Sequence, residues 1–561
     1  MKTPIESEQA KAVKQQYREE VKIMKNNNAG IEDVLDEVLQ SYPAKSMKNR
    51  KEHMLIKDQK KGKHKIKANT RTIPGIITNR GCAYAGCRGV VLGPLKDVVQ
   101  LVHGPIGCSY YAWGMRRHQG VAAEGGKNFI NYTFSTDMQD SDVVFGGERK
   151  LKEAIKEAVE IFNPSTIMIT ATCPVGLIGD DINSIARQAE AEYGITVMAF
   201  NCEGYKGVSQ SAGHHIANNE IMANLVGIED KELDYKYPIN LMGEYNIGGD
   251  AFEIERILEK IGYDIVASFS GNGTADQIKY SHEADLNLVQ CHRSINYIAE
   301  MFEEKYGIPW LKVNFLGVDA TIKALRNMAE YFDDPELKER TEKVIAEELA
   351  QIEGPLNRYK ELFEGKTAFL FVGGSRAHHY QNVFKRIGIE TVVAGYEFGH
   401  RDDYEGREVI PDIEMTADDR NIPELEVTKD DKKYNMRISK AKKEELQQKM
   451  PLDYYEGMIK EMEDGSIVID DLNHHEHIKL TEALEPDIFC SGIKDKYTSH
   501  KMGIFSKQLH SYDYSGPYAG FKGHLQFAED IAAGILNPSW SYINPPWKDN
   551  VELAGTIGGV R

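Results

Sequence analysis

Three of the seven cysteines lie in segments that could present a thiolate to a metal. Cys82 lies in NRGCAYAGCRG, Cys108 in HGPIGCSYY and Cys173 in TATCPVG, each beside glycine or proline. Glycine lets the backbone approach a bulky inorganic group, and proline stiffens the turn that presents the sulfur. Thiolates of this kind hold iron–sulfur clusters. Because spacings of 26 and 65 residues match no compact ferredoxin or zinc pattern, buried structural thiols remain the alternative.

A fourth cysteine, Cys291, stands alone between the apolar run DLNLVQ and the helical pattern HRSINY. A lone buried cysteine is usually packing, but polar residues elsewhere favour a second interpretation. Gln210, His214 and His215 lie in GVSQSAGHH, and His510 lies in the glycine- and tyrosine-rich segment QLHSYDYSGPYAGFKG. Imidazoles together with one thiolate suit a soft transition metal, whereas a lone histidine is more often a core residue.

Three other motifs give weaker signals. GKT at 365–367 is not a Walker A loop, because residue 360 is lysine rather than glycine. GVSQS departs from the serine-hydrolase pattern G-x-S-x-G at its last position. In NHHEH (473–477), Asn473 followed by Glu476 is typical of a helix start, an interpretation that we favour over a zinc site. The other cysteines are interpreted as non-ligands: Cys87, Cys202 and Cys490.

The composition indicates a globular protein with reduced cysteines. Hydrophobic residues make up 41% and charged residues 27% of 561 positions, which suits three or four domains. The net charge of −18 argues against a nucleic-acid partner. MKTPIESEQAK lacks the apolar core of a signal peptide, and no run of about 18 apolar residues occurs. We therefore expect no membrane segment, a cytoplasmic location and cysteines that are thiols or metal ligands.

Strand and helix patterns alternate along most of the chain. Residues 1–75 are polar and helix-prone, and the basic run at 45–71 is typical of a solvated arm. Strands are then predicted at 165–172, 195–201, 264–270, 285–290, 367–374, 389–396 and 485–492. Helices are predicted at 180–194, 251–263, 293–307 and 376–388. This alternation predicts parallel sheets with right-handed crossovers, and the charged segment at about 405–470 reads as a surface insertion.

The unusual residues follow the predicted strands. In doubly wound sheets, ligands bind outside the carboxyl ends of the strands. The residues at such positions are Cys173, Cys291, Gly373, Gly374, Arg376 and Lys494. The sequence therefore predicts that several elements converge on one kind of sheet edge.

Eight motifs, in order between about Thr72 and Trp547, carry a resemblance to a known family. They are RGCAYAG, KDVVQLVHGPIGC, TATCPVGLIGDDI, GVSQSAGHHIAN, SGNGT, EKYGIPW, GYEFGHRDDYEGREVI and LHSYDYSGPYAGF. The chain resembles the alpha subunits of nitrogenase component 1 of the molybdenum–iron type, and its long insertion after Tyr404 resembles the clostridial form. Two features depart from the family pattern: Leu92 replaces a frequent tryptophan, and residues 375–377 replace a Leu–Arg–Pro run.

The resemblance implies an α/β fold of three doubly wound domains, with parallel sheets flanked by helices and a metal cluster in a cleft between domains. The expected divisions are a polar helical arm at 1–75, a first domain at 76–235, a second at 236–360 and a third at 361–561. The first would carry the P-cluster ligands, the second Cys291, and the third His510 together with the insertion at about 405–470.

The resemblance also implies two metal–sulfur cofactors. Cys82, Cys108 and Cys173 would ligate the P-cluster (8Fe-7S), an electron relay shared with a beta subunit. Cys291 would bind the terminal iron of the iron–molybdenum cofactor (7Fe-Mo-9S-C), and His510 would bind its molybdenum, with homocitrate completing the coordination.

Further residues would surround that cofactor, if the resemblance holds. His214 would donate a hydrogen bond to a cofactor sulfur and help to deliver protons, Gln210 would contact homocitrate, and Val90 would form a steric gate. Arg116 and Arg376 would offset the negative charge of the cofactor. The amides of two glycines would approach its sulfurs, and two polar residues would lie at the homocitrate end: Gly373, Gly374, Lys494 and Glu397.

The implied reaction is reduction of dinitrogen to ammonia, with hydrogen evolved alongside. Electrons would come from an ATP-hydrolysing iron protein homodimer, which fits the missing Walker A loop, and would pass through the P-cluster. The implied assembly is an alpha2beta2 heterotetramer acting on dinitrogen, protons and acetylene.

Four alternatives remain open at this stage. A cofactor-assembly scaffold of the same fold tends to lack the full ligand pair, which Cys291 and His510 complete here. Vanadium or iron-only nitrogenases tend to read CGAK where this chain has AGCR (85–88). A protochlorophyllide-reductase-like enzyme should lack the cofactor ligands, and a pure interaction protein should lack the clustered cysteines and histidines.

Overall fold

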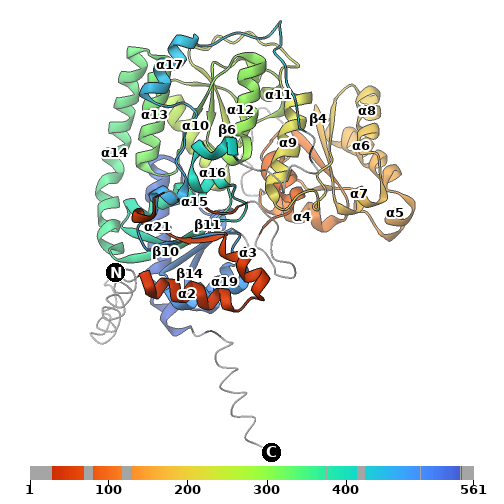
Figure 1. Ribbon diagram of the computed structural model, residues 1–561. Helices are drawn as coiled ribbons and strands as arrows, with labels where there is room; N and C mark the ends of the chain where they lie inside the picture. The colour runs from red at the N-terminus through yellow and green to blue at the C-terminus, as the bar shows by residue number, and fades with distance from the viewer. Residues whose placement is uncertain are drawn as a thin grey trace, which may run out of the picture.

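The computed structural model describes residues 28–62, 64–68, 80–116, 128–374, 376–412, 422, 424–492, 495–543 and 545. The strands form three sheets, in the orders β3-β2-β4-β5, β7-β6-β8-β9 and β1-β12-β11-β10-β13-β14 (Figure 1). Within these sheets every strand pairing is parallel except that of β1 with β12. The α/β class with parallel sheets and flanking helices is thereby confirmed.

The first sheet consists of β2 (Val98–His103), β3 (Phe134–Ser135), β4 (Thr166–Ala171) and β5 (Thr196–Phe200). Its helices are the π-helix η2 (Ala85–Leu92), α4 (Ile106–Gly114), α5 (Asp140–Phe145), α6 (Glu148–Phe162), α7 (Cys173–Ile178), α8 (Ile182–Tyr193) and α9 (Gln210–Asn224). Every residue of β2 and β4 is buried, as expected for central parallel strands. Leu151, Ile155 and Ala158 form the buried stripe of α6, at the spacing of one helix face.

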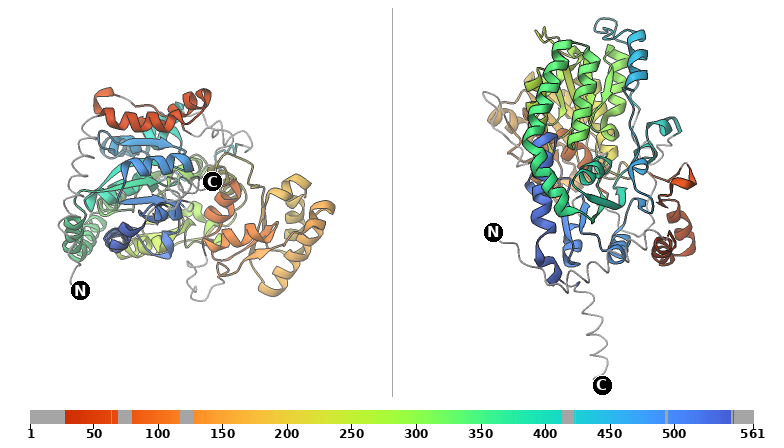
Figure 2. Two further views of the ribbon diagram at one scale, coloured as in Figure 1. Left: turned by 90° about the horizontal axis from the view of Figure 1, so that it is seen from below. Right: turned by 90° about the vertical axis from the view of Figure 1, so that its left-hand side faces the viewer.

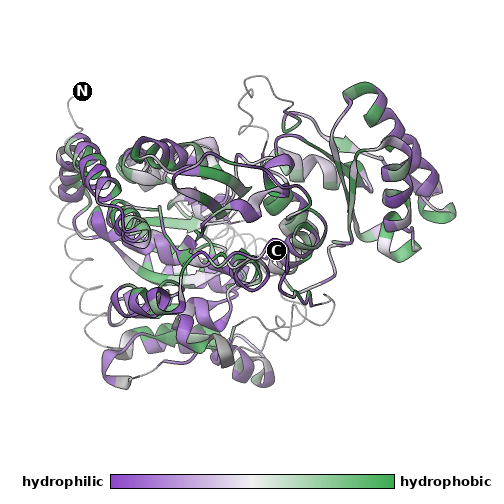
Figure 3. Cartoon of the chain, turned by 90° about the horizontal axis from the view of Figure 1, so that it is seen from above, coloured by the Kyte–Doolittle hydropathy of each residue, from purple (hydrophilic) through white to green (hydrophobic). Residues whose placement is uncertain are grey.

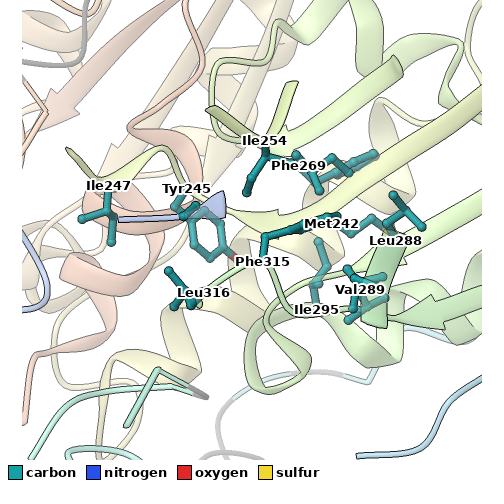
Figure 4. Close-up of a cluster of buried hydrophobic side chains, with 14 of the residues drawn as sticks. Met242, Tyr245, Ile247, Ile254, Phe269, Leu288, Val289, Ile295, Phe315 and Leu316 are labelled. Atoms are coloured by element: carbon teal, nitrogen blue, oxygen red, sulfur yellow. The ribbon is translucent and has the colours of Figure 1, made fainter. Parts of the chain in front are cut away.

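The second sheet consists of β6 (Pro238–Glu244), β7 (Asp264–Ser270), β8 (Leu286–Val289) and β9 (Trp310–Lys312). Its helices are η3 (Ile247–Gly249), α10 (Asp250–Ile261), α11 (Ala275–Lys279), η4 (Ser281–Glu283), α12 (His292–Tyr306), α13 (Val318–Phe332) and α14 (Pro335–Phe363). Figure 4 shows Met242 of β6 and Leu288 of β8 packing near Ile295 of α12. This buried cluster holds the start of α12, directly after Cys291, against the ends of the strands.

The third sheet consists of β1 (Met54–Ile56), β10 (Lys366–Phe371), β11 (Ile389–Tyr396), β12 (Ile467–Asp470), β13 (Ile488–Ser491) and β14 (Phe505–Gln508). Its α-helices are α2 (Asn28–Gln40), α3 (Ala44–Lys51), α15 (Arg376–Arg386), α16 (Arg401–Glu405), α18 (Met458–Glu461), α19 (His474–Leu484), α20 (Lys496–Lys501) and α21 (Gly520–Ile535). Helix α17 (Lys440–Lys449) lies instead beside α13 of the second sheet (Figure 1), where Lys442 binds Asp333 and Lys449 binds Glu330. Short 3-10 turns are η1 (Gln59–Lys61), η5 (Arg407–Asp412), η7 (Tyr512–Tyr514) and η8 (Pro538–Tyr542).

The helices cover the sheets on both sides, as two further views show (Figure 2). Hydrophilic residues predominate on the outer helices, and hydrophobic residues follow the strands (Figure 3). The strands and helices predicted from the sequence are confirmed to within three residues at either end. Within the described ranges, no helix combines the length and apolar character needed to cross a bilayer.

Two segments that the sequence sets apart, the N-terminal arm and the insertion, pack against the rest of the described chain. The described part of the N-terminal arm lies on the third sheet, because α2 packs beside α19 and β1 pairs with β12 (Figure 1). At the end of the segment expected as an insertion, Ile467–Asp470 form a buried strand paired with both β11 and β1. Its earlier part is anchored rather than loose, since Leu446 and Tyr455 are buried.

Candidate metal-cluster sites

Each sheet reverses its strand order at one point, and the predicted ligand segments follow the strands on either side of it. In the first sheet the reversal lies between β2 and β4, which precede Cys108 and Cys173. In the second it lies between β6 and β8, and β8 precedes Cys291. In the third it lies between β10 and β13, which precede Gly373 and Gly492. Such switch points open a crevice at the carboxyl ends of the strands, where ligands bind in this class of fold.

The first candidate site gathers the sulfurs of Cys82, Cys108 and Cys173. A Cβ added to Gly204 would lie 3.0 Å from Sγ of Cys173 and 3.4 Å from Sγ of Cys82. Burial raises the pKa of the Cys108 thiol, and the neighbouring thiols of Cys82 and Cys173 raise it further. No cysteine is disulfide-bonded, and Cys82 and Cys173 are exposed. Three free thiols around a glycine form a donor set suited to an iron–sulfur cluster that is open on one side.

The surface beside these cysteines is apolar. Ile106 and Tyr111 of α4 are 61% and 77% exposed, and Leu177 of α7 is 77% exposed. Both helices carry one of the cysteines in their first turn. Exposed apolar residues gathered in one place mark an interaction surface, so the open side of the first site coincides with a surface suited to a partner.

The second candidate site is built around Gly373 and Gly374, at the end of β10. The backbone N–H of Gly373 donates a hydrogen bond of 3.2 Å to Nε2 of His510. A Cβ on Gly374 would lie 3.4 Å from Sγ of Cys291. Two adjacent glycines therefore bring together a thiol and an imidazole that are 219 residues apart in the sequence. A Cβ at Gly373 would lie 2.0 Å from the ring of Phe398, so only glycine fits at this position.

Glu397 lies on the other side of the His510 ring. Its Oε2 is 3.7 Å from Nδ1 of His510, and the carboxylate is almost fully buried. Gly492 makes this approach possible, because a Cβ there would lie 1.9 Å from Glu397 Oε1 and 2.8 Å from His510 Nδ1. The polar pocket expected around Glu397 thus includes the candidate ligand His510.

Two arginines, Arg116, which is buried, and Arg376, which is 13% exposed, add positive charge beside the second site. Burial lowers the pKa of Arg116 to about 9, and the nearby cation of Arg376 lowers it further. Arg116 Nε donates to Gly89 O at 2.8 Å, and Arg376 Nη1 donates to the Tyr512 hydroxyl at 2.5 Å. The Arg376 cation thus destabilises the charged form of Arg116, and an anionic group beside the two guanidinium groups would offset that repulsion.

Helix α9 extends from one candidate site to the other. His214 is buried, and its ring lies 5.7 Å from Phe398 and 6.3 Å from Tyr245. Gln210, one turn earlier, packs instead against the segment that contains Cys82, since a Cβ on Gly81 would lie 2.4 Å from Gln210 Oε1. The carbonyl of Val90 accepts a 3.2 Å hydrogen bond from Arg116 Nη2. The structure therefore places His214 beside the second site and Gln210 beside the first, and Lys494 lies outside the described residues.

Sequence reasoning missed three residues of the second site. Asp250, fully buried, accepts hydrogen bonds from the Tyr512 hydroxyl and the Tyr518 amide and lies 3.6 Å from Arg376. Burial lowers the pKa of Lys312 to about 7, and the neighbouring Cys291 thiol opposes this shift. Only the segment NIGGD before α10 carried a local signal for Asp250. Nothing in the local sequence marks Lys312, and Phe398 lies in the motif GYEFGHRDDYEGREVI without a residue-specific signal.

The donor set of the second site fits an anionic metal–sulfur group. A thiol and an imidazole supply soft and borderline ligands, and the two glycines leave space that any Cβ would fill. The guanidinium groups of the buried Arg116 and the partly buried Arg376 supply compensating charge.

Comparison with known proteins gives concordant results. Residues 82–536 match the family model for nitrogenase component 1 type oxidoreductases. The chain is 58% identical to the nitrogenase molybdenum-iron protein alpha chain of Clostridium pasteurianum, over 94% of this chain and 99% of the relative. It is 53% identical to the corresponding chain of Methanosarcina barkeri, over 92% and 97%. A solved structure described as nitrogenase Cp1 at pH 6.5 superposes with a TM-score of 0.88 and 58% identity, covering 92% of this chain and 100% of that one.

Proposed function

The chain belongs to the nitrogenase component 1 type oxidoreductases, and we propose that it serves as the alpha chain of a molybdenum–iron nitrogenase that reduces dinitrogen to ammonia. The observation that carries this proposal is the pairing of Cys291 and His510 across Gly373 and Gly374. A scaffold or a chain without the cofactor has no need for both ligands.

Cys291 and His510 would hold the iron–molybdenum cofactor, with homocitrate at the end near Glu397 and Lys494. When bound, this cofactor supplies the metal centre at which the bond chemistry of dinitrogen reduction occurs. Arg116 and Arg376 offset its negative charge, and the amides of Gly373 and Gly374 approach its sulfurs. The support for these roles is the burial of Arg116, the partial burial of Arg376 and the space left by the two glycines.

Cys82, Cys108 and Cys173 would ligate the P-cluster together with a beta chain. The exposure of Cys82 and Cys173 and the apolar residues around them support a cluster completed by a partner. The working assembly is an alpha2beta2 heterotetramer, to which an ATP-hydrolysing iron protein delivers electrons. We also assign the complex to the cytoplasm, where its cysteines stay reduced.

His214 would move protons to the reacting face. Its imidazole suits that task because an unperturbed histidine titrates near pH 6.5. Tyr245 and Phe398 pack against the ring and exclude bulk water, which would otherwise discharge stored electrons onto protons. Val90 would act as a steric gate next to Arg116, and Gln210 would contact homocitrate, although it packs against the Cys82 segment in this structure.

Metal analysis combined with activity tests this function. The purified complex should contain molybdenum and iron, and should reduce acetylene only when the iron protein and ATP are added. Cys291→Ala should lose molybdenum while it keeps the iron of the P-cluster. Vanadium in place of molybdenum would support the alternative nitrogenase, and molybdenum without any acetylene reduction would support the assembly scaffold.

A further inference from the structure

The segment NHHEH at the start of α19 sends its side chains in different directions. Asn473 caps the helix as expected, since its Oδ1 accepts from the Glu476 amide at 3.1 Å and Glu476 Oε2 accepts from the Asn473 amide at 3.2 Å. His475 points toward the residues that directly follow α2, where its Nε2 lies 2.9 Å from Ser41 Oγ. His474 and His477 are left on a different face, one helical turn apart.

His474 and His477 meet Asp495, which precedes α20. Oδ1 of Asp495 lies 3.4 Å from Nδ1 of His474 and 3.7 Å from Nδ1 of His477. One ligand atom from each of the three residues lies within 4.8 Å of the others. Around a tetrahedral zinc ion with bonds of about 2.0–2.2 Å, neighbouring ligand atoms are separated by roughly 3.3–3.5 Å. The three side chains therefore need only small adjustments to close on a metal ion.

The orientation of His477 is a second, independent indication of a ligand. The ring is fully buried and stacks on Phe489 at 4.1 Å, and its Nε2 lies 3.0 Å from Ser499 Oγ. Its Nδ1 is buried and faces Asp495 Oδ1 at 3.7 Å, too far for a normal hydrogen bond, and no closer partner lies among the described residues. Buried ring nitrogens normally have a partner. Metal-binding histidines have this arrangement, with one nitrogen on the metal and the other fixed by a hydrogen bond.

We propose that His474, His477 and Asp495 bind one divalent transition-metal ion, with zinc as the best match to two imidazoles and a carboxylate. His474 is 49% exposed, so water can take the fourth position. The ion links α19 to α20. It also fixes the position of Asp495, three residues after Gly492, which lies next to Glu397 and His510. Its role is structural, because neither histidine contacts the candidate cofactor ligands.

A second cluster of possible ligands, formed by Asp230, His282 and Glu283, does not carry the same proposal. The ammonium group of Lys433 already binds Asp230, whose side chain is 71% exposed. In the His474 cluster the carboxylate of Asp495 is buried, at 5% exposure.

Zinc binding to the cluster-containing complex tests the proposal. After brief chelation, the complex is dialysed against radioactive Zn²⁺, and bound zinc is counted per alpha chain. His474→Ala removes a half-exposed ligand, so the protein should fold, and we expect at least tenfold weaker binding at one site. His475→Ala is the matched control, because this neighbouring imidazole faces the residues that directly follow α2, and it should bind zinc as the unchanged protein does.

Two further measurements locate the ion. Crystals soaked in Zn²⁺ should show an anomalous peak at the zinc edge between the three side chains. Ser499→Ala, which keeps all three ligands but releases Nε2 of His477, should weaken binding about tenfold. Dinitrogen reduction should remain unchanged in the His474 and His475 variants. Equal zinc binding by His474→Ala and the unchanged protein, or no anomalous peak at this position, would overturn the proposal.

Discussion

Gly373 and His510 are joined by a hydrogen bond in which the backbone N–H donates to Nε2 of the ring at 3.2 Å. Nε2 is therefore the unprotonated nitrogen, and Nδ1, which faces Glu397 at 3.7 Å, carries the proton. Metal binding requires an unprotonated nitrogen. Cofactor binding must then either replace the Gly373 hydrogen bond or remove the proton that faces Glu397.

Gly373→Ala should reduce the occupancy of the cofactor. The new Cβ would lie 2.0 Å from a ring carbon of Phe398 and 2.9 Å from His510 Nε2, so the imidazole would have to move. Overpacking of this kind costs about 1–3 kcal/mol, enough to lower occupancy severalfold. Molybdenum per complex should fall while P-cluster iron is retained. Gly354→Ala is the control, because a Cβ there meets nothing within 4 Å; equal molybdenum in both variants would contradict the assigned position of the cofactor.

His214→Leu should impair dinitrogen reduction more than proton reduction. General acid–base groups contribute about 10²–10⁴-fold to a rate, and proton reduction can use less specific donors. Ammonia formation should therefore fall at least tenfold, while total hydrogen evolution changes much less. His215→Leu is the matched control, since this ring packs edge-on against Tyr297 at 4.4 Å. If ammonia and hydrogen formation decline in parallel, His214 has no selective role in proton delivery.

The sequence predicted the sheets and the ligand-bearing segments, but not the contacts that join them. Cys173 and Cys291 could be placed at strand ends because the apolar runs before them end at polar residues. The approach of Asp250 to Arg376 joins α10 to α15, and Tyr518 from the segment after β14 also binds Asp250; no local pattern encodes this packing. The same holds for β1, whose antiparallel pairing with β12 joins residues more than 400 positions apart.

The complex should lose stability as the pH falls from about 6.5 to 4. Burial lowers the pKa of His292 and of His524 to about 4, below the ordinary value of 6.5. In this window the unfolded chain binds protons that the folded chain excludes, so acid favours unfolding. For one such histidine the loss between pH 7 and pH 5 is about 2 kcal/mol.

His524→Asn tests this pH dependence. The amide oxygen can replace Nδ1, which accepts a hydrogen bond from the Val318 amide at 3.1 Å, but asparagine does not titrate. Urea-unfolding midpoints measured at pH 7 and pH 5 should differ less for the variant than for the unchanged protein. Parallel decreases in both proteins would show that His524 is not excluded from protonation in the folded state.

Tyr455, in the expected insertion, should support the Cys291 site. Its ring stacks on His292 at 3.7 Å, and its hydroxyl hydrogen-bonds the buried Asp402. Tyr455→Ala should cost about 3–5 kcal/mol and lower molybdenum content, because His292 directly follows Cys291. Tyr455→Phe keeps the stacking and should cost only about 1–2 kcal/mol. If Tyr455→Ala has the molybdenum content and the stability of the unchanged protein, Tyr455 does not support the Cys291 site.

The N-terminal arm should be held in place by the ion pair of Arg50 with Glu476. Arg50 Nε and Nη2 lie 2.5 and 2.8 Å from the two carboxylate oxygens, and both side chains are buried. Removing one partner of a buried pair leaves an uncompensated charge, so Arg50→Met should cost about 3–5 kcal/mol. Adding Glu476→Gln removes that charge while its amide oxygen can still accept from the Asn473 amide, so the double variant should recover much of the loss.

Urea midpoints of the two variants, together with the rate of limited proteolysis between α2 and β1, measure this effect. The single variant should be cleaved faster because its arm detaches from α19, and the double variant should approach the unchanged protein. If the double variant is no more stable than Arg50→Met, the loss comes from the packing of the arginine side chain. Within the described part of the basic run, Arg50 is buried and pairs with Glu476, and this ion pair adds to the attachment that α2 and β1 already give the arm.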